Sequence, residues 1–130
     1  MALDASAARE HVCTAHADVL AAVGAAADAV DAAAASSGPR LGAALESRLT
    51  DRGVLASLPG VLAAAVSAAG GELPAEPVAA PPYVVVTGRG PVLRATLDAG
   101  RLVVELRVFA LTDANRYERR DGVAVEASVR

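Results

Sequence analysis

The sequence predicts an α+β fold in which N-terminal helices pack on one face of a C-terminal antiparallel β-meander of four to five strands. Of the 33 alanines, 27 lie in residues 1–80, whereas ten of the 18 valines lie in residues 81–130. Alanine favours helices and valine favours strands. Between these regions, residues 70–82 hold two glycines and four prolines, which is typical of an extended connection. We therefore expect a single domain, 1–130, with helices in residues 1–70, a connection in 71–82 and a sheet in 83–130.

Composition excludes several protein classes. Hydrophobic residues make up 54% of the chain and charged residues 21%, which excludes disordered, collagen-like and disulfide-built proteins. The net charge of −3 is too small to indicate a nucleic-acid surface by itself. Cys13 is the only cysteine, and no basic segment followed by an apolar one opens the chain, so we expect a cytoplasmic protein.

The first predicted helix runs from Asp4, a candidate N-cap, to Ala35. Written in sevens from Val12, its apolar residues share one side and its carboxylates the other. One row of that side contains only alanine, which allows a second backbone to approach closely, and the segment from Arg40 is the expected neighbour.

Two further helices are predicted before residue 70. Leu41, Leu45 and Leu49 recur every four residues after Pro39, a residue favoured in a first helical turn. A third helix at 59–69 places one apolar stripe on its surface and ends at two glycines. The stripe consists of Leu58, Leu62, Ala65, Val66 and Ala69.

The last 50 residues alternate with a period of two, as half-buried strands do. A hairpin through residues 98–101 places both apolar sets on one face and sets Arg94 across from Glu105. Its predicted pairs are Leu97 with Leu102, Ala95 with Val104 and Leu93 with Leu106.

Two more strands are predicted, at 83–87 and 123–129, with a less regular segment before the second. Asp121-Gly122 indicates another hairpin, whereas Thr112 is a possible cap for a short helix. We favour a strand for residues 116–120.

Glu10, Cys13 and His16 are three residues apart and so share one helical face, where a thiolate and an imidazole suit zinc or nucleophilic catalysis. A metal needs further ligands, and His11 faces away from these residues on a continuous helix. We therefore favour a structural interpretation, in which Cys13 is a small buried thiol and His16 edges the packing face.

Residues 53–71 carry no charge and meet the length criterion for crossing a bilayer. Pro59-Gly60 interrupts this stretch, and six of its residues are alanine. We favour a kinked helix or hairpin buried against the sheet, with a peripheral membrane contact as the alternative.

Arginines on the polar side of the strands form a possible footprint for phosphates. Carboxylates lie among them, so cross-strand ion pairing is the favoured interpretation. The turn 88–90 lacks a following helix and is interpreted as a turn rather than an anion site. The arginines are Arg89, Arg94, Arg101, Arg107, Arg116, Arg119 and Arg120.

Residues 54–78 and 79–109 resemble a small family of uncharacterised haloarchaeal proteins. The shared features are a Pro-Pro-Tyr entry to a valine-rich strand, a Gly-Arg-Gly-Pro turn and an Asp-Ala-Gly hairpin. The resemblance implies a salt-rich cytoplasm and an unassigned function.

The sequence favours a non-enzymatic interaction module over an enzyme, with a protein partner or a second copy of the chain bound at the polar sheet face or at the alanine row of the first helix. We expect no catalytic, cofactor-binding or metal-binding residue, and neither a nucleic acid nor a membrane as partner. The alternatives are a small-ligand or metal-dependent enzyme that uses Cys13 and His16, and weak nucleic-acid binding through the arginines. The candidate interaction residues are Arg94, Arg107, Phe109 and Tyr117.

Overall fold

The computed structural model describes residues 2–130 and confirms the α+β class. Its helical segments are α1 (Ala5–Ala15), α2 (Ala17–Asp28), the 3₁₀ turn η1 (Ala32–Ala34), α3 (Gly38–Asp51), the 3₁₀ turn η2 (Leu55–Ser57) and α4 (Leu58–Ala68). Its strands are β1 (Val84–Val86), β2 (Pro91–Leu97), β3 (Gly100–Leu111) and β4 (Tyr117–Val129).

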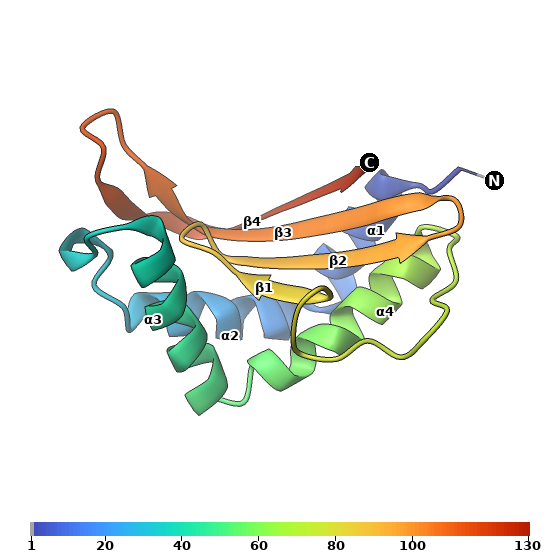
Figure 1. The fold of residues 1–130 in the computed structure, drawn as a ribbon, viewed down its shortest axis with the longest axis horizontal. Coiled ribbons are helices and arrows are strands. Elements are labelled where there is room, and N and C mark those ends of the chain that lie inside the picture. The colour runs from blue at the N-terminus through green and yellow to red at the C-terminus, as the bar shows by residue number, and fades with distance from the viewer. Residues whose placement is uncertain (1) are drawn as a thin grey trace.

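The four strands form one antiparallel sheet in the order β1-β2-β3-β4. Figure 1 shows the helices on one side of this curved sheet and the end of the β3–β4 hairpin projecting beyond them. Leu93 and Leu106 are fully buried, in one hydrophobic cluster with residues of all four helices. The prediction that helices cover the apolar face of a meander is therefore confirmed, and we call the opposite face of the sheet the outer face.

The single long helix predicted from Asp4 to Ala35 is wrong. Asp4 does cap α1, because its side chain accepts a hydrogen bond from the Ala7 N–H at 3.0 Å, but the helix breaks at His16 (φ −121°, ψ 30°). A straight helix of that length spans about 48 Å, whereas the longest inner strand, β3, extends only about 40 Å. The break lets α1 pack against α4 and β4, and α2 against α3 and β4.

The break also interrupts the predicted alanine row. Ala8 is buried, whereas Ala15 and Ala29 are exposed. The expected neighbour, α3, packs against α2, while α4 takes the place beside α1. The row therefore does not form one continuous interface.

The second and third helices are confirmed with small changes of boundary. Leu41, Leu45 and Leu49 are each 0% exposed on α3, whose N-cap Ser37 accepts the Arg40 N–H at 3.3 Å. All five stripe residues predicted for the third helix are buried. Residues 71–82 contain no helix or strand, as expected for the connection.

The predicted register of the β2–β3 hairpin is wrong by two residues. Leu97 pairs with Gly100 and Ala95 with Leu102, so the turn contains only Asp98 and Ala99. Arg94 consequently faces Val103 rather than Glu105. A shift of two residues keeps every side chain on its predicted face, which explains why the burial pattern was right and the pairs were not.

The chain turns between β3 and β4 at residues 112–116, so the hairpin predicted at Asp121-Gly122 is wrong. Thr112 accepts the Asn115 N–H on its carbonyl oxygen at 2.9 Å, and Asn115 adopts a φ of 60°, which asparagine tolerates. Residues 117–120 belong to β4, as favoured, and Asp121-Gly122 lies within the same strand.

Phe109, a candidate interaction residue that the alternation of the strand places on the polar sheet face, is only 1% exposed and belongs to the core. The N–H groups of Val108 and Phe109 both donate to the Arg89 carbonyl oxygen, at 2.8 and 3.1 Å. Two successive N–H groups that share one acceptor mark a β-bulge, at which strict alternation stops. The bulge turns Phe109 inward beside Val108.

Candidate functional site

The outer-face arginines have different surroundings, and these decide which of them are available to a ligand. Arg107 lies 2.8 Å from Glu105 Oε2 and 3.1 Å from Glu126 Oε2, measured from its Nη2. The two glutamates face each other across β3 and β4, so Arg107 relieves their repulsion. The ion pairing favoured from the sequence is confirmed here, and the charge of Arg107 is balanced.

Arg119 is also engaged, by the backbone. Its Nη1 donates to the carbonyl oxygens of Val108, Arg120 and Gly122 at 3.2, 2.6 and 2.7 Å. Its Nε lies 2.9 Å from Asp28 Oδ1, and its Nη2 donates to the Gly24 carbonyl oxygen at 3.3 Å. The guanidinium joins β4 to α2 and is not free to bind a phosphate.

Arg94 and Arg101 project from β2 and β3 into a hollow on the outer face. The hollow has a volume of about 190 Å³. The backbone N–H of Arg94 donates to the Tyr83 carbonyl oxygen at 2.8 Å, which fixes the position of Arg94. Arg101 Nε donates to Thr96 Oγ1 at 3.3 Å. The lining residues are Leu73, Pro74, Pro82, Tyr83, Arg94, Thr96 and Arg101, which together we call the arginine pocket.

The side chain of Arg94 carries an unmet hydrogen-bonding group. Its Nε is buried and has no hydrogen-bond partner in residues 2–130. In the same range, neither Arg94 nor Arg101 lies within ion-pair distance of a carboxylate. A buried donor without a partner costs roughly 1–3 kcal/mol, so an acceptor that reached the Arg94 Nε would remove that cost.

The four residues predicted as one interaction surface lie in four different environments. Arg94 lines the arginine pocket, Arg107 bridges two glutamates and Phe109 is in the core. Tyr117 is half-buried, and its hydroxyl packs against Gly38 at the start of α3. The structure therefore does not join these four residues into one exposed patch.

Cys13 and His16 are both half-buried, and Cys13 packs against the core. His11, expected to face away, lies beside His16 with ring centroids 5.5 Å apart in an edge-to-face arrangement. The break at His16 explains the difference, because residues beyond it no longer follow the α1 periodicity. No group of three metal-binding side chains forms within residues 2–130.

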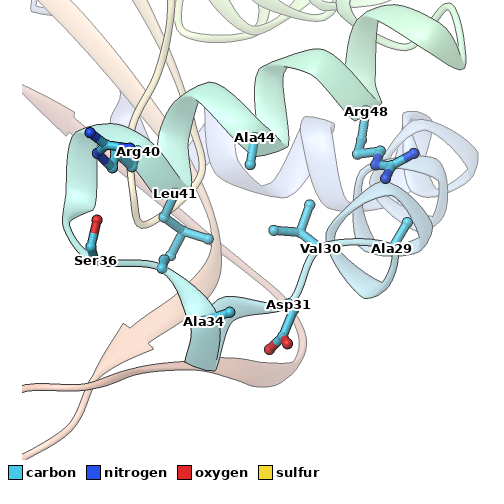
Figure 2. A pocket seen from close by; sticks show the side chains of 10 residues that line it. Ala29, Val30, Asp31, Ala34, Ser36, Arg40, Leu41, Ala44 and Arg48 are labelled. Atoms are coloured by element: carbon cyan, nitrogen blue, oxygen red, sulfur yellow. The ribbon is translucent and has the colours of Figure 1, made fainter.

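A second hollow, of about 320 Å³, lies between the end of α2, η1 and α3 (Figure 2). Val30 and Leu41 point into it, and Arg40 and Arg48 stand at its two ends. We call it the α2–α3 groove. Its lining residues are Ala29, Val30, Asp31, Ala34, Ala35, Ser36, Arg40, Leu41, Ala44 and Arg48.

Over residues 2–130, no single helix has the length and apolar composition needed to span a membrane. The uncharged stretch 53–71 forms η2 and α4, and its leucines at 58 and 62 are fully buried in the core. Combined with α3 it passes the length and composition criteria, but the pair is bent by 82°.

A protein-family model described as "Domain of unknown function (DUF7988)" matches residues 6–130. The chain belongs to this family. The DUF7988 match covers every helix and strand except Ala5, the first residue of α1. It extends well beyond residues 54–109, which suggested a family of unassigned function. A haloarchaeal origin stays a prediction. No curated protein and no solved structure matches the chain.

Sequence reasoning missed how the DUF7988 chain assembles the arginine pocket. Arg94 and Arg101 were both recognised as polar-side arginines, but their partners in the pocket were not. Thr96 carried a signal, because it shares the alternation of Arg94. Leu73, Pro74 and Pro82 carried none, since the path of a proline-rich connection is set by what it packs against.

Proposed function

We propose that this protein is a non-enzymatic interaction module that binds an acidic segment of a protein partner and takes one carboxylate into the arginine pocket. The observation that carries the proposal is the buried Nε of Arg94, a charged donor without a partner in residues 2–130, beside a second arginine with no carboxylate near it in that range. Arginine binds carboxylates through two parallel hydrogen bonds, and such charge-assisted bonds are about twice as strong as neutral ones.

The size of the pocket favours a single side chain over a larger ligand. Sites for drug-sized molecules occupy roughly 300–1,000 Å³. The arginine pocket, at about 190 Å³, holds a carboxylate and its short stem. Leu73, Pro82 and the ring of Tyr83 provide apolar walls for such a stem.

The surroundings of the pocket favour a protein over a nucleic acid. Val103, directly across from Arg94, is 2% exposed and lies outside the main core, beneath the side chains of the outer face. Farther along β3, Glu105 and Glu126 balance Arg107. Because Arg107 is neutralised, Arg94 and Arg101 do not continue along this face into the positive stripe that a phosphate backbone needs.

A second copy of the chain is one source of the acidic segment. Residues 1–80 carry four arginines against nine carboxylates, whereas residues 81–130 carry eight arginines against six. Oppositely charged halves can meet head to tail, which would make the module self-associating. Peptide binding and sedimentation of the protein alone separate these two sources.

The experiment measures binding of a labelled peptide of alternating glutamate and glycine, with a glutamine-for-glutamate peptide as the uncharged control. We expect the acidic peptide to bind more tightly than the control, and Arg94→Gln to weaken acidic-peptide binding at least about tenfold, the equivalent of about 1.4 kcal/mol. Arg116→Gln is the matched variant, because Arg116 is an exposed arginine of the β3–β4 turn outside the pocket.

Two results would overturn the proposal. One is equal binding of the two peptides, and the other is equal loss of binding in Arg94→Gln and Arg116→Gln. Sedimentation of the protein alone over about a hundredfold concentration range tests the second-copy source. Association that Arg94→Gln abolishes identifies the chain as its own partner, whereas a monomer that binds the acidic peptide identifies a different protein.

A further inference from the structure

We propose that the α2–α3 groove is a second, separate site, which binds a small organic carboxylate with an apolar body. The inference does not depend on the arginine pocket, because the groove lies among the helices and the pocket lies on the outer face of the sheet.

The walls of the groove provide the apolar region of the site. Val30 and Ala35 are half-buried and pack against the core, and Leu41 is fully buried. Ala44, on the exposed side of α3, contributes only a methyl group, so the space above it stays open. The resulting volume of about 320 Å³ lies within the range of small-molecule sites, roughly 300–1,000 Å³.

Charge at the ends of the groove selects an anion. Arg40 and Arg48 are eight residues apart on α3, which corresponds to about 12 Å along the helix axis. Within residues 2–130 neither guanidinium forms an ion pair or a side-chain hydrogen bond. The helical half is acidic overall, yet these two cations lie beside an apolar hollow with no carboxylate partner in that range.

Figure 2 shows how these groups are arranged. Arg48 extends toward Ala29 at the end of α2, while Arg40 lies at the opposite end of the groove. The carboxylate of Asp31 points away from both guanidiniums and so leaves their charge unneutralised. An anion at either end, with its apolar body over Val30 and Ala44, satisfies the charge and covers the hollow.

The experiment titrates ¹⁵N-labelled protein with octanoate and follows the amide shifts. Octanol supplies the apolar chain without the charge, and acetate supplies the charge without the chain. We expect octanoate to shift amides of residues 29–48 more strongly than either control compound at equal concentration, because only octanoate uses both the hollow and the arginines.

Two variants of one helix separate the groove from general effects. Ala44→Leu fills the hollow and is expected to weaken octanoate binding at least about tenfold. Ala43→Leu makes the same change at an exposed neighbour that does not line the groove, and is expected to leave the affinity within about twofold. Both variants keep a good helix former in α3.

Charge is tested with Arg40→Gln and Arg48→Gln, of which at least one is expected to reduce the preference for octanoate over octanol. Octanoate shifts that leave residues 29–48 unaffected, or an affinity unchanged by Ala44→Leu, would overturn the inference. Arg94→Gln is expected to retain octanoate binding. The proposed function is tested by binding of the acidic peptide, and the inference is tested by binding of octanoate. Arg94→Gln therefore separates the two, because it is expected to weaken only the binding of the peptide.

Discussion

The Arg119 guanidinium donates to four backbone carbonyl oxygens, which belong to β3, β4 and α2. Between the pairs Arg107–Ala124 and Phe109–Arg119, a single residue of β3 faces residues 120–123 of β4, so the sheet ladder cannot satisfy that segment. The Arg119 guanidinium compensates by donating to two carbonyl oxygens of the segment and to those of Val108 and Gly24. A side chain that counts as a surface cation in the sequence is a structural clamp.

Arg119→Lys is expected to lower the free energy of unfolding by about 2 kcal/mol. Lysine keeps the charge but cannot present the planar set of donors, so partly buried carbonyl oxygens lose their partners. Urea unfolding of both proteins, followed by circular dichroism, measures the difference. Arg120→Lys, a change at the exposed neighbouring residue, is expected to cost less than about 0.5 kcal/mol, and equal losses would contradict the clamp.

At the scale of elements, the β1–β2 turn connects the sheet to α3 and to the bulge of β3. Gly88 lies so close to Gly38 that a Cβ would come within 2.8 Å of the Gly38 carbonyl oxygen. Gly90 has a φ of 145°, and a Cβ there would collide with the Leu106 carbonyl oxygen. The same turn supplies the Arg89 carbonyl oxygen that holds the bulge. The turn interpretation of residues 88–90 is right, and its glycines are explained by packing.

Gly90→Ala is expected to destabilise the fold by at least about 3 kcal/mol, because it combines a backbone conformation reserved for glycine with a direct overlap. Gly60→Ala is the matched change in the first turns of α4, where a Cβ meets nothing within 4 Å, and is expected to stabilise the fold by about 0.5 kcal/mol. Thermal melts of both variants provide the comparison. A Gly90→Ala protein as stable as the wild type would show that the turn tolerates a side chain.

At the scale of the whole molecule, the core is built from small side chains. Its largest fully buried members are Phe109 and eight leucines, and the remaining core residues are mainly valine and alanine. Buried apolar area contributes about 25 cal/mol per Å², and alanine contributes little area. The fold therefore has less hydrophobic stabilisation than its number of buried residues indicates.

Molar sodium sulfate is accordingly expected to raise the melting temperature, since surface-excluded salts strengthen apolar burial. A gain of about 1 kcal/mol corresponds to about 4 °C for a domain of this size. A parallel series in protein concentration tests whether an interface between copies contributes as well. A melting temperature indifferent to both salt and protein concentration would contradict the expectation.

Much of the architecture was predictable because it follows local rules. The alternation of Leu93, Ala95 and Leu97 set their face, and the leucines of α3 set its buried side. The arginine pocket was only partly predictable. Arg94 was recognised as a polar-side residue, but its lack of a partner within residues 2–130 depends on where residues 71–83 run, and alternation carries no information about that path.

The sequence by itself determined the α+β class, the order of the elements and the side of each strand that is buried, because these depend on periodicity and on turn residues close together in the chain. The tertiary structure decided the break at His16, the inward turn of Phe109 and the separate roles of Arg94, Arg107 and Arg119. Each of these depends on contacts between residues far apart in the chain. The bulge forms because a distant backbone carbonyl oxygen is present, and the Arg94 donor is unpaired because no acceptor in residues 2–130 lies near it. A pattern of neighbouring residues in the sequence contains no information about such distant groups.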